Sequence, residues 1–155
     1  MDVARFQGSV VSCEYDTGDL SNLMEGDYVA PIGNAFPAVD AFMVTKNPFF
    51  DSLYQGKALV GFQMAGSKKT SGQHWLKGPH IVSWIEKVKK LHVDVSKVVI
   101  VFIVNDEDLS GWNAQSFKTD NNVGKKWNVY KKLPNALKGI EQFALGMKTG
   151  QRDST

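Results

Sequence analysis

The sequence has little of what several protein classes need. Its 155 residues include one cysteine, Cys13, so an intramolecular disulfide is excluded, as is any zinc site that needs two thiolates. The longest apolar run, residues 98–104, is far shorter than the ~18 residues of a membrane span. The first 20 residues carry scattered charges in place of the basic and then apolar pattern of a secretory signal. We therefore expect an intracellular protein with no membrane partner.

Arginine is scarce where basic residues are plentiful. Residues 57–155 hold 15 lysines and one arginine, whereas residues 1–56 hold eight acidic residues and two basic ones. Clustered lysines suit contact with a phosphate backbone, because each neutralised phosphate releases counterions. Base reading usually needs the planar guanidinium of arginine, so backbone contact is the expected mode. A solvated surface that keeps the chain soluble is the other interpretation. The candidate nucleic-acid-binding residues are Lys68, Lys69, Lys77, Lys125 and Lys126.

The apolar patterns that are present predict one small α/β domain. Alternating and β-branched residues predict strands at 38–44 and 57–64, which form an antiparallel hairpin or lie close together in one sheet. Residues 98–104 predict a strand covered on both faces. Apolar residues at helical spacing predict one helix that begins at Pro79 and runs to residue 91, and a last helix over 134–147.

The remaining segments are predicted to be less regular. A short strand at 9–12 and a turn at 16–19 are expected in an irregular N-terminal segment, residues 1–27. Residues 65–78 and 110–132 are predicted to be loops. The α/β domain then covers residues 28–148, and residues 149–155 form a disordered tail.

Two predicted strands each contain a polar residue among apolar neighbours. Asp40 follows Val39, and Gln63 follows Phe62. A buried carboxylate without a partner costs several kcal/mol, so such a residue usually has a metal, a positive partner or a hydrogen-bond network. If the strands pair, Asp40 and Gln63 share one edge of the sheet and offer the oxygen donors that Mg²⁺ accepts. The alternative is that Asp40 caps a neighbouring backbone group and Gln63 is an ordinary satisfied residue.

His80 follows Pro79 at the start of the first predicted helix. At this position an imidazole can bind a phosphate or act as an acid or base. The alternative is a residue of the helix start whose ring is satisfied by its neighbours. His74 is the weaker candidate of the two.

The order of several motifs resembles a known family. Residues 34–42 read Asn-Ala-Phe-Pro-Ala-Val-Asp-Ala-Phe, residues 59–64 read Leu-Val-Gly-Phe-Gln-Met, and a histidine then opens a helix. This series is similar to the C-terminal restriction-endonuclease-like domain of Crinkler-type effectors and retrotransposon hot spot proteins. The resemblance covers roughly residues 28–147.

The resemblance implies a restriction-endonuclease-like core, a small mixed sheet flanked by helices. It implies Mg²⁺ held by Asp40 and Gln63, and it makes His80 the family's helix-opening histidine. It also implies a lysine two residues after the second ligand, where this sequence has Ala65. Lys68 or Lys69 from the following loop would have to replace it. The larger members of the family carry an upstream ATPase. The resemblance also implies a nuclear location.

Two interpretations of function stay open. In the first, the domain binds nucleic acid and hydrolyses phosphodiesters with Mg²⁺, using Asp40, Gln63, Lys68 and His80. In the second, the nuclease fold is catalytically degenerate and serves as a protein-interaction module, with a protein partner or a second copy of the chain. Ala65 favours the second interpretation. The sequence leaves the choice of DNA or RNA, the activity and the oligomeric state undetermined.

Overall fold

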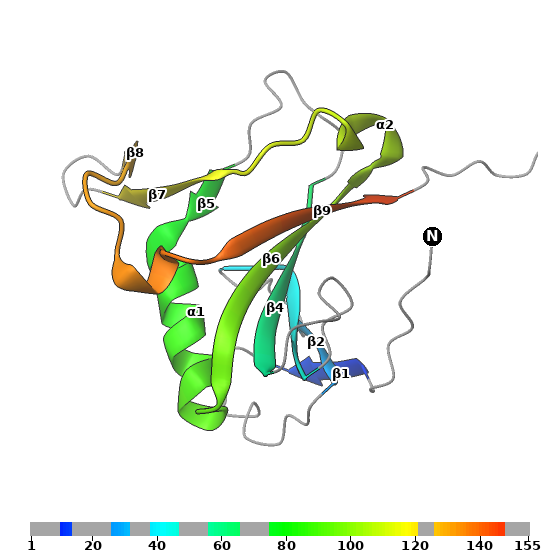
Figure 1. Ribbon diagram of the computed structural model, residues 1–155, viewed down its shortest axis with the longest axis vertical. Coiled ribbons are helices and arrows are strands. Elements are labelled where there is room, and N and C mark those ends of the chain that lie inside the picture. Colours follow the sequence, from blue (N-terminus) through cyan, green and yellow to red (C-terminus); the bar gives the residue numbers. More distant parts are fainter. Residues whose placement is uncertain are drawn as a thin grey trace, which may run out of the picture.

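The computed structural model describes residues 10–13, 26–31, 38–46, 56–65, 75–120 and 126–147 (Figure 1). Its strands are β1 (Val10–Cys13), β2 (Tyr28–Pro31), β3 (Ala41–Thr45), β4 (Lys57–Met64), β5 (Trp75–Lys77), β6 (Val95–Asn105), β7 (Ser116–Asp120), β8 (Trp127–Val129) and β9 (Glu141–Met147). Its helices are α1 (Gly78–Leu91), the single turn α2 (Asp106–Leu109) and the 3₁₀ turn η2 (Asn135–Leu137). The predicted turn at 16–19 and the predicted tail at 149–155 lie outside the described residues.

The strands form two mixed sheets, which confirms the predicted α/β class. The larger sheet has six strands in the order β1-β2-β3-β4-β6-β9, and the smaller has the order β5-β7-β8. The strand predicted at 57–64 is β4, and it pairs antiparallel with β3 as expected. It pairs on its other side with β6, in parallel. The short strand predicted near 9–12 is β1, which pairs with β2 in the same sheet.

Strand β6 lies inside the larger sheet and is apolar on both faces. Ile100 and Phe102 belong to the cluster that includes α1, and Val99 and Val101 belong to a second cluster on the opposite face. All four side chains are fully buried. Because parallel strands are usually covered on both faces, a continuous β-branched run is the pattern expected here. The sequence prediction for residues 98–104 is therefore confirmed.

Helix α1 covers one face of the larger sheet (Figure 1). Pro79 lies in its first turn, where a backbone N–H has no partner within the helix, so its absence costs nothing. Two lysines in the last turn interact favourably with the negative end of the helix dipole. Its apolar stripe is buried, and Trp84 is the largest side chain with no exposed surface. The Trp84 ring meets Phe42 of β3 edge to face, with ring centroids 5.8 Å apart. Helix α1 confirms the predicted helix.

The prediction of a last helix over residues 134–147 is wrong. The chain forms η2 and then β9, which pairs in parallel with β6 and sets Phe143 beside Val101. Gly139 has a φ of 82°, a left-handed conformation that interrupts helical winding. The apolar residues 143, 145 and 147 also fit the two-residue period of a strand. Backbone groups on the free edge of β6 need partners, and β9 supplies them.

Side chains also hold β9 in place. The amide of Gln142 accepts a hydrogen bond from the Gln115 N–H at 2.7 Å and donates one to the Gln115 carbonyl at 3.0 Å. Lys97 of β6 pairs with Glu141 at the start of β9, with 3.0 Å between Nζ and Oε1. With β9 as a strand, α1 is the one helix longer than four residues in the described part of the chain. The sheet is therefore flanked by fewer long helices than the two that the sequence predicts.

The smaller sheet arises from segments that the sequence predicts to be loops, and that prediction is wrong. β5 falls within residues 65–78, and β7 and β8 fall within 110–132. β5 pairs in parallel with β7, and β7 pairs antiparallel with β8. The sheet lies beside the first turns of α1 (Figure 1). Leu76 and Phe117, paired across β5 and β7, pack against the main core and attach the small sheet to it.

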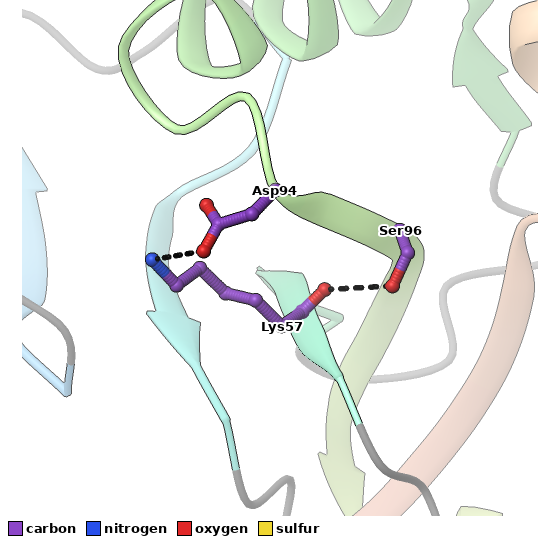
Figure 2. A network of polar contacts seen from close by, with 3 residues as sticks. All are labelled: Lys57, Asp94 and Ser96. Carbon is purple, nitrogen blue, oxygen red and sulfur yellow. Dashed lines mark hydrogen bonds and ion pairs between the residues drawn. The ribbon is translucent and has the colours of Figure 1, made fainter.

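A polar network ties the beginning of β4 to the beginning of β6 (Figure 2). Lys57 Nζ lies 2.9 Å from Asp94 Oδ2, and the Ser96 hydroxyl donates to the Lys57 carbonyl at 3.5 Å. The register of β4 on β6 shifts between Lys57 and Ala58, so side chains supplement the ladder at this point. The ion pair lowers the pKa of Asp94, chiefly through the hydrogen bond from Lys57.

We expect the stability of the fold to decrease below pH 6.5 because of His92, the residue that ends α1. Burial first, and the charge of Lys57 second, lower the pKa of His92 from 6.5, against the opposing effect of Asp94. The unfolded chain therefore binds the extra proton at a higher pH than the folded chain. The contribution of neutral His92 to the free energy of unfolding is fully present above pH 6.5. It is lost as the pH falls from 6.5 to the lowered pKa of His92 in the folded protein. Urea unfolding across this range should show a shallower pH dependence in His92→Gln, and identical slopes would contradict the assignment.

Candidate functional site

Asp40 and Gln63 lie on neighbouring chain segments at the same end of the β3–β4 pair. The ladder between these strands ends at the pair Ala41 and Phe62, so Asp40 lies just beyond it, beside the end of β4 that carries Gln63. The Asp40 N–H donates to the Phe62 carbonyl at 2.9 Å, which holds the Asp40 backbone beside the end of β4. That the two side chains share one edge of the sheet stays a prediction.

The Asp40 carboxylate extends the β3–β4 ladder beyond the end of β3. Its Oδ2 accepts a hydrogen bond from the Met64 N–H at 2.6 Å. The other carboxylate oxygen has no hydrogen-bond partner among the described residues. Burial, and then the negative charge of Asp40, raise the pKa of Tyr28 on β2. The side chain thus caps a backbone group, as one interpretation of the sequence expected, and keeps one oxygen for another role.

Gln63 carries a buried oxygen without a hydrogen-bond partner. Its Oε1 is shielded from solvent and receives no hydrogen bond from the described residues. Alternation along β4 sets Gln63 on the same face as Gly61, which lies under Trp84 of α1. A buried amide oxygen that is left unsatisfied costs about 1–3 kcal/mol, so its retention calls for an explanation such as a ligand.

The donor set fits Mg²⁺ in kind. Asp40 offers one carboxylate oxygen and Gln63 offers one amide oxygen, both hard ligands. In the described part of the chain, no group of three or more His, Cys, Asp or Glu side chains is arranged to hold a metal ion. Mg²⁺ is often held by one or two protein groups, with water and substrate phosphates completing its shell. A two-residue site is therefore chemically reasonable.

Ala65 occupies the position where the resembled family has its lysine. Its side chain is 1% exposed and belongs to the cluster that packs around α1. Its N–H donates to the Ile103 carbonyl of β6 at 2.9 Å. The position two residues after Gln63 is therefore a small apolar part of the core. The structure brings no described cation to this point in the lysine's place.

Three other predicted site residues, His80, Lys77 and Lys126, lie elsewhere in the fold, at α1 and the small sheet. His80 lies in the first turn of α1, and its ring meets Trp127 of β8 edge to face, with centroids 5.8 Å apart. Lys77 ends β5, and its Nζ lies 5.6 Å from the centre of the Trp127 ring. Lys126 is exposed and directly precedes β8. Lys68, Lys69 and Lys125 lie outside the described residues.

Tryptophan and lysine side chains gather on one face of the small sheet. Trp75 and Lys77 of β5, Lys118 of β7 and Trp127 of β8 form what we call the basic-aromatic surface. The two indole rings have centroids 5.2 Å apart, and Lys118 Nζ lies 5.2 Å from the centre of the Trp75 ring. These distances suit attraction between an ammonium group and a π-system.

Sequence reasoning missed three of these four residues. Lys77 is the one residue of the four that the sequence predicts, because clusters of lysines along the chain do not reveal which tryptophans lie beside them. The available signal was the alternation Trp75-Leu76-Lys77, which sets an aromatic and a basic side chain on one face of a strand. The partners Lys118 and Trp127 come from a region that the sequence predicts to be a loop.

Comparison with known proteins adds no relative. No family model, curated protein or solved structure gives a significant match to this sequence. Among the described residues, no helix combines the length and the apolar character that crossing a membrane requires.

Proposed function

We propose that this chain is a restriction-endonuclease-like domain that binds nucleic acid and hydrolyses phosphodiesters with Mg²⁺ held by Asp40 and Gln63. The observation that carries the proposal is the buried Gln63 Oε1, which lacks a hydrogen-bond partner among the described residues and directly follows Phe62, whose carbonyl accepts the Asp40 N–H. An isolated amide oxygen has no reason to be retained there, whereas a hard cation would satisfy it.

The sheet topology supports this proposal. An aspartate directly before one strand and a glutamine within the next are what the resemblance to the Crinkler and retrotransposon hot spot domains implies. β3 and β4 are antiparallel neighbours, and α1 and β6 follow β4 in the chain. The hydrogen bonds that Asp40 makes with residues 62 and 64 hold it beside the end of β4, near the position of Gln63.

Each residue of the proposed site has a distinct role. Bound Mg²⁺ would supply positive charge at a phosphodiester and favour attack by water. Asp40 contributes the negative charge that retains the cation, and the Met64 N–H fixes the orientation of its carboxylate. Gln63 adds a neutral donor. A water-orienting cation would come from Lys68, in the segment after β4, since position 65 is an alanine and His80 lies against Trp127 of β8.

A degenerate nuclease fold is the second candidate, and a specific observation favours it. Ala65 is 1% exposed and packed in the core, so the position of the family's lysine carries no positive charge. In addition, one oxygen of Asp40 is already occupied by a backbone N–H. On this alternative the chain binds nucleic acid or a protein partner without cleaving its ligand.

We expect Asp40→Asn to lower metal-dependent cleavage roughly 100-fold or more, the scale of a lost charged group at a reacting centre. Asparagine keeps an oxygen that accepts the Met64 N–H, so the fold is retained. Asp40→Ala would also leave that N–H without a partner, at a cost of about 1–3 kcal/mol. The measurement is cleavage of single- and double-stranded DNA and RNA with Mg²⁺ or Mn²⁺, with a chelator as control.

The assay separates the two candidates. Equal cleavage by wild type and Asp40→Asn would contradict the assigned site. Absence of cleavage in both proteins, with salt-sensitive binding of nucleic acid in both, would support the degenerate fold. Cleavage by the wild type that Asp40→Asn loses would reject that alternative.

A further inference from the structure

The small sheet has an inner face that packs against the core and an outer face that points away from it. Leu76 of β5 and Phe117 of β7 face inward, where they pack against the main cluster. Side chains alternate along a strand, so the neighbours of these two residues point outward. Trp75, Lys77 and Lys118 are therefore on one outer face.

Strand β8 adds its own side chains to this face. Lys118 faces Val129 across the ladder, and Asp120 faces Trp127. Opposite residues of an antiparallel pair share a face, so Trp127 and Val129 lie on the same side as Lys118. Trp75 is 37% exposed and Val129 is 67% exposed. The face is thus open to solvent although it carries two tryptophans.

The charges on this face have one dominant sign. Lys77 Nζ lies 5.6 Å from the centre of the Trp127 ring, and Lys118 Nζ lies 5.2 Å from that of Trp75. Exposed Lys126 lies directly beside Trp127 in the chain. Asp120 is the acidic residue of the same face. Each aromatic ring therefore has an ammonium group next to it.

We propose that the basic-aromatic surface binds single-stranded nucleic acid, with bases stacked on Trp75 and Trp127 and phosphates on Lys77 and Lys118. A single strand alternates flat apolar bases with anionic phosphates, and the surface alternates flat rings with cations at matching sites. Bases inside a duplex are stacked on one another and cannot reach an indole face. The inference rests on the nucleic-acid-binding part of the proposed function and is independent of the metal site.

The test is a binding titration with labelled strands of about 12 nucleotides, within the usual site size of small single-strand-binding domains. The probes are oligo(dT), oligo(U) and a DNA duplex of the same length, each in a chelator-containing buffer that excludes cleavage. Wild type is expected to bind one or both single strands more tightly than the duplex. The two single-stranded probes decide between DNA and RNA as the source of this chemistry.

The variants isolate stacking from charge. The double variant Trp75→Leu/Trp127→Leu is expected to weaken single-strand binding at least about tenfold, because two stacking contacts are lost. Trp75→Phe/Trp127→Phe keeps aromatic faces and should retain most of the affinity. Lys77→Gln/Lys118→Gln should weaken binding and its salt dependence, whereas the exposed pair Lys89→Gln/Lys90→Gln on α1 is the matched control. Circular dichroism and thermal unfolding verify that each variant is folded.

The possible results are distinguishable. Tighter binding of the duplex, or single-strand affinity that survives Trp75→Leu/Trp127→Leu in a folded protein, would overturn this inference while leaving the proposed function intact. Absence of binding to every probe would reject this inference and the nucleic-acid part of the proposed function together. A loss confined to the tryptophan and Lys77/Lys118 variants would support both.

Discussion

Gly61→Val is expected to destabilise the fold by about 3 kcal/mol or more, through overpacking of a core that has no space for a side chain. A Cβ atom at Gly61 would lie 2.7 Å from Trp84 Cη2 and 2.8 Å from Val39 Cγ1. Both of these side chains are almost completely buried, and Gly61 lies in β4 between its partners in β3 and β6. Neither neighbour can move toward solvent. Gly61→Ala should have the same sign, at about 1–3 kcal/mol.

A double-mutant cycle tests the proposed cause. Trp84→Phe removes the ring atoms that a Cβ at Gly61 would meet, and it also removes the buried Trp84 Nε1, which lacks a hydrogen-bond partner. The cost of Gly61→Ala should therefore be smaller in the Trp84→Phe background, with a coupling of about 0.5–3 kcal/mol. Urea unfolding of the four proteins measures it. Strictly additive costs would show that contact with Trp84 is not the reason for glycine.

Gln63→Leu is expected to have opposite effects with and without metal. Without Mg²⁺, leucine of similar volume removes an unsatisfied buried oxygen, so the free energy of unfolding stays constant or rises by about 1–2 kcal/mol. With saturating Mg²⁺, wild type gains about 3 kcal/mol at a hundred times the dissociation constant, or roughly 5–10 °C in unfolding temperature. The variant should lose this gain.

Gln142→Leu is the matched control for that experiment. The Gln142 amide makes two hydrogen bonds with the backbone of Gln115, so its loss should destabilise the fold by about 1–3 kcal/mol. It should leave the Mg²⁺-dependent rise unchanged. Scanning calorimetry with and without Mg²⁺ measures both quantities. Equal Mg²⁺ effects in wild type and Gln63→Leu would show that Gln63 is not a ligand.

The elements with a strong periodic pattern are predictable from the sequence. β4 has the bounds expected for residues 57–64, and α1 and β6 contain their predicted residues. β3 begins at Ala41 and not at residue 38, because Val39 turns inward over Gly61 and Asp40 forms a bend. This bend depends on the contact of Val39 with β4, which is distant in the sequence, so the local sequence pattern does not predict it.

β9 and the small sheet could not be predicted by the same reasoning. Residues 134–147 fit both a helical and a strand period, and the choice depends on the edge of β6. β5 and β8 have three residues each, and β5 pairs with β7 across a long stretch of chain. The position of Asp40 next to the end of β4 follows from the expected pairing of the two strands. The Met64 N–H bond to Asp40 and the pairing of lysines with tryptophans needed the three-dimensional arrangement.

The central claim is that Asp40 and Gln63 hold a divalent cation, and Mn²⁺ binding followed by electron paramagnetic resonance tests it most directly. The free Mn²⁺ signal should fall on addition of wild type and of Gln142→Leu, in proportion to protein. Asp40→Asn and Gln63→Leu should leave most of the ion free. Uptake that is the same in all four proteins, or no uptake by wild type, would contradict the claim.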